Sequence, residues 1–108
     1  MDFKRISVAD AAAMIQENAG QVQVVDIRDE ESYRQGHIAG AFHLHNSNIQ
    51  DYIQEADPES PLLVCCYHGH MSQSAAAYLS EQGFRETYSL DGGFEAWAQS
   101  MAGESESG

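Results

Sequence analysis

The chain has 108 residues, with 17 Asp or Glu against 5 Lys or Arg, and so a formal net charge of −12 at pH 7. Its length is that of one compact domain, and the 43% apolar share is enough for a hydrophobic core. Nucleic acid and anionic membrane surfaces are bound through clustered Lys and Arg, which five scattered cations cannot supply. We therefore expect no nucleic-acid partner and no membrane partner, and no apolar run approaches the roughly 18 residues of a bilayer span.

Hydrophobic periodicity predicts that short strands alternate with helices along the chain. The predicted helices run from residue 7 towards residue 20 and over residues 29–35, 48–56, 72–82 and 94–101. The predicted strands cover residues 22–27, 41–44, 61–66 and 87–90. This alternation is typical of an α/β fold, here with a central, mostly parallel sheet of four or five strands flanked by helices. We expect a single domain over residues 1–102 and a flexible tail over residues 103–108, whose residues are small and charged.

Helix ends are indicated by individual residues. Ser7, followed three residues later by Asp10, predicts the start of the first helix. Gly36 follows the second predicted helix, and we expect it to adopt the left-handed backbone conformation that often ends helices.

The two cysteines, Cys65 and Cys66, are adjacent in the sequence. Neighbouring cysteines form only a strained disulfide, and the chain has neither a Cys-x-x-Cys nor a His-x-x-x-His pair for a metal. The N-terminus has no apolar segment of the kind found in signal peptides. We expect free thiols, no metal and a cytoplasmic location.

Cys66 ends the most apolar predicted strand, and in an open parallel sheet ligands bind beyond the carboxyl ends of the strands. A polar loop follows and leads to a helix, so several backbone N–H groups and the positive end of the helix should face the sulfur. Both features favour a thiolate and would hold an anionic substrate. The residues of this candidate site are Tyr67, His68, Gly69, His70, Met71 and Ser72.

Burial in the core is the alternative role for either cysteine. It suits Cys65, which precedes the end of the strand and should point into a core layer. Position alone leaves Cys66 open between a reactive thiol and a core thiol.

Three motifs in order along the chain resemble those of the rhodanese family. They are Val25-Asp26-Ile27-Arg28 with Tyr33, Gly36-His37-Ile38 and Gly40-Ala41; Cys66-Tyr67-His68-Gly69; and Gly83-Phe84 with the run from Tyr88 to Trp97. The resemblance spans roughly residues 5 to 99 and is greatest to the short, single-domain, GlpE-like type of the family.

The resemblance implies a rhodanese fold and a double-displacement sulfur transfer without a cofactor. Cys66 would take the outer sulfur of thiosulfate, release sulfite and hold a persulfide. The acceptor would be cyanide, a thiol or a small dithiol protein such as thioredoxin.

Three residues outside the loop are expected to support the site. Asp26 and Arg28 share one face of a strand, and we expect them to form an ion pair that fixes the loops around the cysteine. His37 is expected to be structural, next to the site.

Two features of the loop depart from what this chemistry would favour. The family commonly has a hydroxyl residue where this chain has Met71, whose thioether cannot donate a hydrogen bond. Ser72 follows directly and could reach the sulfur from the first turn of the helix. The loop also has no Lys or Arg, so only backbone dipoles and partly protonated His68 or His70 can offset the negative chain, and thiosulfate should bind weakly.

Three other functions compete with sulfur transfer. A cysteine phosphatase or arsenate reductase would need the pattern Cys-x5-Arg, but Ser72 occupies the arginine position. A non-catalytic binding module is compatible with Met71. A redox switch that uses both cysteines is disfavoured by their adjacent spacing.

Overall fold

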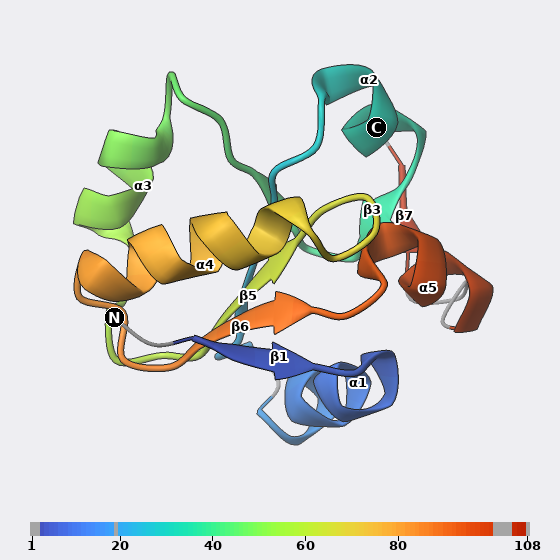
Figure 1. The fold of residues 1–108 in the computed structure, drawn as a ribbon, viewed down its shortest axis with the longest axis horizontal. Coiled ribbons are helices and arrows are strands. Elements are labelled where there is room, and N and C mark those ends of the chain that lie inside the picture. The colour runs from blue at the N-terminus through green and yellow to red at the C-terminus, as the bar shows by residue number, and fades with distance from the viewer. Residues whose placement is uncertain (1–2, 19, 101–104, 108) are drawn as a thin grey trace.

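The computed structural model describes residues 3–18, 20–100 and 105–107. A five-stranded sheet forms its centre, in the order β1-β6-β5-β2-β4, and every neighbouring pair is parallel. The strands are β1 (Lys4–Ile6), β2 (Gln23–Asp26), β4 (Phe42–His43), β5 (Leu62–Cys65) and β6 (Thr87–Leu90). This arrangement confirms the predicted α/β fold and parallel sheet (Figure 1).

Helices cover both faces of the sheet (Figure 1). They are α1 (Val8–Glu17), α2 (Glu30–Gln35), α3 (Ile49–Glu55), α4 (Met71–Glu81) and α5 (Gly93–Ser100). The predicted last helix extended to Met101, which lies outside the described residues. Within the described residues, no helix combines the length and the apolar character that crossing a bilayer requires.

The central strand β5 divides the core into two layers, because successive side chains of a strand point to opposite faces. Leu63 and Cys65 belong to the layer that contains Ala11 of α1 and Trp97 of α5. Leu62, by contrast, packs in the layer formed with α3 and α4. The strand is buried on both faces, which accounts for its continuous apolar sequence.

The predicted start of the first helix is confirmed, whereas the predicted conformation of Gly36 is wrong. The Ser7 hydroxyl accepts a hydrogen bond from the Asp10 N–H at 3.1 Å. Gly36 has a φ of 174°, which is extended backbone. The chain continues directly into β3 (His37–Ile38), and the Gly36 carbonyl accepts a hydrogen bond from Arg28 Nη2 at 2.6 Å, so no reversal occurs there.

Three short strands were not predicted from the sequence. One is β1, and the others are β3 and β7 (Ser105–Glu106), which pair with each other in antiparallel orientation. Part of the segment expected to be a flexible tail therefore lies beside β3, while residues 103, 104 and 108 lie outside the described residues. These three strands have two or three residues each, too few to show a period in the sequence, whereas the equally short β4 was predicted from the longer segment 41–44.

Candidate active site

Cys66 lies directly after β5, at the edge of the sheet where the parallel strands end. The strand register places Asp26 beside Cys65 and His43 beside Asp26 at this same edge. The chain then turns through a short loop into α4. Cys66 is 1% exposed, so its sulfur lies beneath this loop rather than on the surface.

Hydrogen-bond donors surround the Cys66 sulfur. The N–H groups of Gly69 and Ser72 each donate to Sγ at 3.2 Å, and Ser72 Oγ also lies 3.2 Å from it. Burial alone would raise the pKa of Cys66, but hydrogen bonds from Ser72, Gly69 and the His68 N–H outweigh it and lower the pKa below its ordinary value. The predicted arrangement of loop amides around this sulfur is confirmed.

The carbonyl groups of the same loop point outward and are bound by other elements. The Phe94 N–H, at the start of α5, donates to the Cys66 carbonyl at 2.8 Å, and the Glu95 N–H donates to the Tyr67 carbonyl at 3.3 Å. Gln73 Nε2 donates to the Gly69 carbonyl at 2.9 Å. Because the N–H and C=O of one peptide point in opposite directions, the hydrogen bond to the Tyr67 carbonyl keeps the His68 N–H of the same peptide directed inward.

Two glycines allow the loop to pack directly on the start of α5. Gly69 has a φ of +92°, and a Cβ atom there would lie 2.8 Å from the Gly92 nitrogen. Gly93 has a φ of +61°, and its Cβ atom would lie 2.5 Å from the carbonyl oxygens of Cys66 and Tyr67. Paired glycines between a strand and a helix, as at Gly92-Gly93, are a sequence signal of such close backbone approach.

Met71 and Ser72 take different roles in the structure. The Met71 side chain is exposed, whereas Ser72 is fully buried with its hydroxyl against the sulfur. The hydroxyl that is absent at residue 71 is thus supplied from residue 72, as expected from the sequence. This is also the residue that replaces the arginine of the Cys-x5-Arg pattern.

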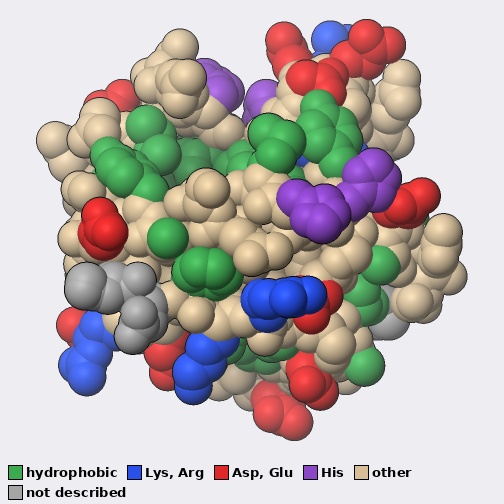
Figure 2. Space-filling model, viewed as in Figure 1, with side chains coloured by type: hydrophobic (Ala, Val, Ile, Leu, Met, Phe, Trp, Pro, Cys, Tyr) green, Lys and Arg blue, Asp and Glu red, His purple; other side chains and the backbone are tan. Residues whose placement is uncertain are grey.

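The remaining side chains of the loop lie around its outer surface. The Tyr67 hydroxyl donates to the Asp29 carboxylate, and this hydrogen bond is the main reason that the pKa of Asp29 is well below its usual range. His68 Nε2 lies 3.1 Å from a carboxylate oxygen of Glu95, with both side chains exposed. Figure 2 shows histidine side chains gathered over the loop between β5 and α4, and His70 is likewise exposed.

Asp26 and Arg28 form the predicted ion pair. Arg28 Nη2 lies 2.8 Å from Asp26 Oδ2, Nε binds both carboxylate oxygens, and both side chains are buried. The same guanidinium donates to the Gly36 carbonyl and lies 4.4 Å from the centre of the Phe94 ring. The pair therefore ties the end of β2 to the start of β3 and to α5.

His37 is buried and held by neighbouring groups, which agrees with a structural role. Its Nδ1 lies 2.7 Å from the Tyr33 carbonyl oxygen, and its ring stacks on that of Tyr33 with centroids 3.8 Å apart. Its Nε2 lies 3.4 Å from a carboxylate oxygen of Glu106 in β7.

His43 and His45 lie side by side near the end of β4. Their ring centroids are 5.3 Å apart, edge to face, and His43 Nε2 lies 2.6 Å from the Arg28 carbonyl oxygen. Across the part of the chain that the structure describes, no three His, Cys, Asp or Glu side chains come together in a group that could hold a metal ion.

Cys65 is as buried as Cys66, but its pKa is shifted in the opposite direction. It lies in the core layer with Leu63 and Trp97 and is fully buried. Burial, followed by the charge of Asp26, raises the pKa of Cys65. The expectation that Cys65 is a core residue is confirmed.

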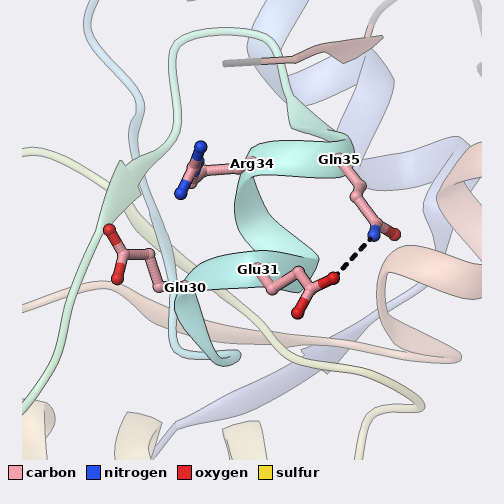
Figure 3. Close-up of a pocket in the computed structure, with 4 residues that line it drawn as sticks. All are labelled: Glu30, Glu31, Arg34 and Gln35. Carbon is pink, nitrogen blue, oxygen red and sulfur yellow. Dashed lines mark hydrogen bonds between the residues drawn. The ribbon is translucent and has the colours of Figure 1, made fainter.

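Hollows elsewhere on the surface differ in character. One lies on α2 and is lined by Glu30, Glu31, Arg34 and Gln35, where Gln35 Nε2 donates to Glu31 at 3.3 Å (Figure 3). It contains no residue of the Cys66 loop. Another is more apolar and adjoins the start of α4, with Ile27, Leu44, His45, Asn46, Ile49, Met71 and Ala75 around it.

A cysteine held by loop amides beyond the carboxyl edge of a parallel sheet defines a class of α/β domain built around an anion-binding thiol. The sequence model of the rhodanese-like domain matches residues 7–100. The chain belongs to this rhodanese family.

Named relatives and a solved structure agree with this assignment. A protein named thiosulfate sulfurtransferase GlpE from Stutzerimonas stutzeri is 60% identical over 96 residues, which cover 89% of this chain and 85% of the relative. The protein of the same name from Pseudomonas entomophila is 53% identical over 107 residues, covering 99% and 95%. The solution structure of a rhodanese-like domain from Anabaena has a TM-score of 0.82 at 20% identity, covers 99% of this chain and 80% of that one, and has the same fold.

Replacing Gly93 with alanine should displace the loop, because the new Cβ would overlap the carbonyl oxygens of Cys66 and Tyr67. We expect Gly93→Ala to lower the free energy of unfolding by roughly 2 kcal/mol or more, and to slow alkylation of Cys66. Gly20→Ala is the matched control, since Gly20 has a φ of +79° but open space around it. Equal losses in urea titrations of the two variants would contradict the proposed contact.

The two thiols should titrate differently. Because hydrogen bonds lower the pKa of Cys66, its thiolate should form at a pH below that of an ordinary cysteine, whereas Cys65 should stay protonated through the same range. Alkylation by iodoacetamide, followed by peptide mass across a pH series, should label Cys66 first. The urea-unfolded chain is the control, in which both cysteines should follow one ordinary profile. Labelling of both at the same pH in the folded chain would refute the assignment.

Proposed function

We propose that this chain is a thiosulfate sulfurtransferase that carries the transferred sulfur on Cys66. The observation that supports this most strongly is the set of donors around the Cys66 sulfur, together with relatives that are named for this activity. A sulfur surrounded by N–H and O–H groups favours the charged form that both the attacking thiolate and a persulfide require.

In the first half of the reaction, the Cys66 thiolate attacks the outer sulfur of thiosulfate. A new S–S bond forms to Cys66 as the original S–S bond breaks, and its electron pair leaves on sulfite. Three negative charges stand on each side of this step, so no proton transfer is needed. The N–H groups of the loop stabilise the developing charge. In comparable sites the loss of one such donor costs on the order of 3 kcal/mol of transition-state stabilisation.

In the second half, a nucleophilic acceptor attacks the outer sulfur of the persulfide. Cyanide would be converted to thiocyanate and a thiolate to a persulfide. The Cys66 thiolate is the leaving group and is restored in both cases. A small dithiol protein such as thioredoxin could also serve as acceptor, releasing sulfide as it forms its own disulfide. The exposed Met71 and the apolar hollow beside it lie at the start of α4, where an acceptor with an apolar surface could approach.

The residues around Cys66 are given distinct roles in this proposal. The N–H groups of His68, Gly69 and Ser72 hold the negative sulfur, with the Ser72 hydroxyl as a further donor. The side chains of Tyr67, His68, His70 and Met71 form the outer surface over which substrates arrive.

Asp26, Arg28 and His37 support the site from outside and do not contact the sulfur in this scheme. Free thiols at Cys65 and Cys66 are consistent with a cytoplasmic location, because such compartments keep thiols reduced.

Incubation with thiosulfate should add the mass of one sulfur atom to the intact protein, and cyanide should then remove it. Cys66→Ala should abolish the gain, because it removes the attacking atom. Cys65→Ala should retain it, since that side chain lies in the core, and so serves as the matched control. A folded and reduced wild-type chain that gains no sulfur would contradict the proposed reaction and favour a non-catalytic binding module.

Salt should improve the use of thiosulfate. The chain carries a charge of −12 and the loop has no Lys or Arg, so a dianion is repelled at long range. Raising the ionic strength from about 0.01 M to about 0.15 M shortens the screening length from roughly 30 Å to roughly 8 Å. We expect KM for thiosulfate to fall several-fold over this range, while alkylation of Cys66 by neutral iodoacetamide changes little. A KM that rises with salt would show that local cations govern binding.

A further inference from the structure

A second buried hydroxyl lies behind Ser72. Ser89 is on β6, in register with Val64 of the adjacent strand β5, and its Oγ lies 2.7 Å from Ser72 Oγ. Ser72 Oγ in turn lies 3.2 Å from Cys66 Sγ. Ser72 and Ser89 are both 0% exposed, so a line of three polar atoms runs from the sulfur into the sheet, away from solvent.

The position of Ser89 has no simpler explanation in the local backbone. A buried hydroxyl is costly unless it is hydrogen-bonded, and many bond a backbone carbonyl nearby. Thr87, two residues earlier on the same strand, does this with the Phe84 carbonyl at 3.4 Å. Ser89 instead has its partner in the first turn of α4, on the residue that contacts the reactive sulfur.

The charge on the sulfur fixes the direction of these hydrogen bonds. A thiolate or persulfide can only accept, so the Ser72 O–H donates to sulfur and leaves its oxygen to accept from Ser89. A protonated thiol can donate to Ser72, whose O–H then turns to Ser89. The two arrangements differ by the proton on the sulfur, whereas each serine keeps its own proton and only its O–H bond rotates.

We propose that Ser89 is a positioning residue for the charged sulfur of Cys66, acting through Ser72. This inference rests on the proposed function, in which that sulfur carries charge during transfer. When the sulfur is negative, the Ser89 O–H donates to Ser72 Oγ, which strengthens the donor that Ser72 presents and holds its rotamer toward the site. Hydrogen bonds in such chains polarise one another, by roughly 10–30% per bond.

The test compares five variants: Ser89→Ala, Ser89→Thr, Ser72→Ala, the double alanine variant, and Thr87→Val as the matched control that removes a buried hydroxyl from the same strand. The readouts are the pH profile of Cys66 alkylation by iodoacetamide and the rate of sulfur uptake from thiosulfate. Circular dichroism and the melting temperature establish that each variant is folded.

Ser89→Ala should move the alkylation profile to higher pH and slow sulfur uptake about two- to fivefold, the size of a strengthened charged hydrogen bond. Ser72→Ala should slow uptake by about tenfold or more, because it removes the direct donor. The double variant should match Ser72→Ala, since Ser89 acts only through that hydroxyl. Ser89→Thr, which retains the hydroxyl, should restore the wild-type profile, and Thr87→Val should leave the profile unchanged even if it lowers the melting temperature.

An unchanged alkylation profile in Ser89→Ala, or effects that multiply in the double variant, would overturn the role of Ser89. A shifted profile in a protein whose wild type takes up no sulfur from thiosulfate would support the role of Ser89 and overturn the proposed reaction instead. The two proposals can therefore fail separately.

Discussion

Hydrogen bonds hold the loop around Cys66 both from its inner side and from its outer side, and the rest of the site depends on this constraint. N–H groups point inward to the sulfur, and the carbonyl oxygens of Cys66 and Tyr67 are held from outside by the first amides of α5. The donors are thus oriented before any substrate arrives, so no reorganisation is needed when charge develops. An isolated loop of this length could not keep several like-oriented dipoles together without such outer partners.

The outer partners are themselves fixed by an ion pair one strand away. Arg28 binds Asp26 with two nitrogens and covers the Phe94 ring, while Phe94 provides the N–H that holds the Cys66 carbonyl. Breaking such a buried pair leaves an uncompensated charge, which makes the arrangement rigid. The Arg28 guanidinium is thus occupied by Asp26 and by the Gly36 carbonyl within the fold.

Sequence reasoning identified what depends on local pattern. The strand and helix that flank Cys66, the contribution of Ser72 and the pairing of Asp26 with Arg28 all follow from residues close together in the chain or from period-two alternation. The resemblance to the rhodaneses then assigned the reactive cysteine where position alone left two roles open.

What the sequence did not disclose comes from contacts between distant segments. The extended backbone of Gly36 is set by its connection to β3, and β3 itself is matched by a two-residue strand some 70 positions later. Gly69 lies against Gly92, and Ser72 is hydrogen-bonded to Ser89. These contacts join the segment after β5 to the end of β6, which are neighbours only in the folded sheet. Apart from the paired glycines Gly92-Gly93, no pattern within one segment carries this information.

The N–H groups of His68 and Gly69 that bind the sulfur belong to the main chain. Stabilisation of the charge is therefore separate from the side chains that meet the substrate. Replacement of the His68, His70 or Met71 side chain leaves the peptide nitrogens where they are. The outer surface of the loop can therefore diversify without loss of the ionised nucleophile. Evolution can in this way alter which sulfur donors and sulfur acceptors bind while the same chemistry is inherited, provided that Gly69 and Gly93 are retained.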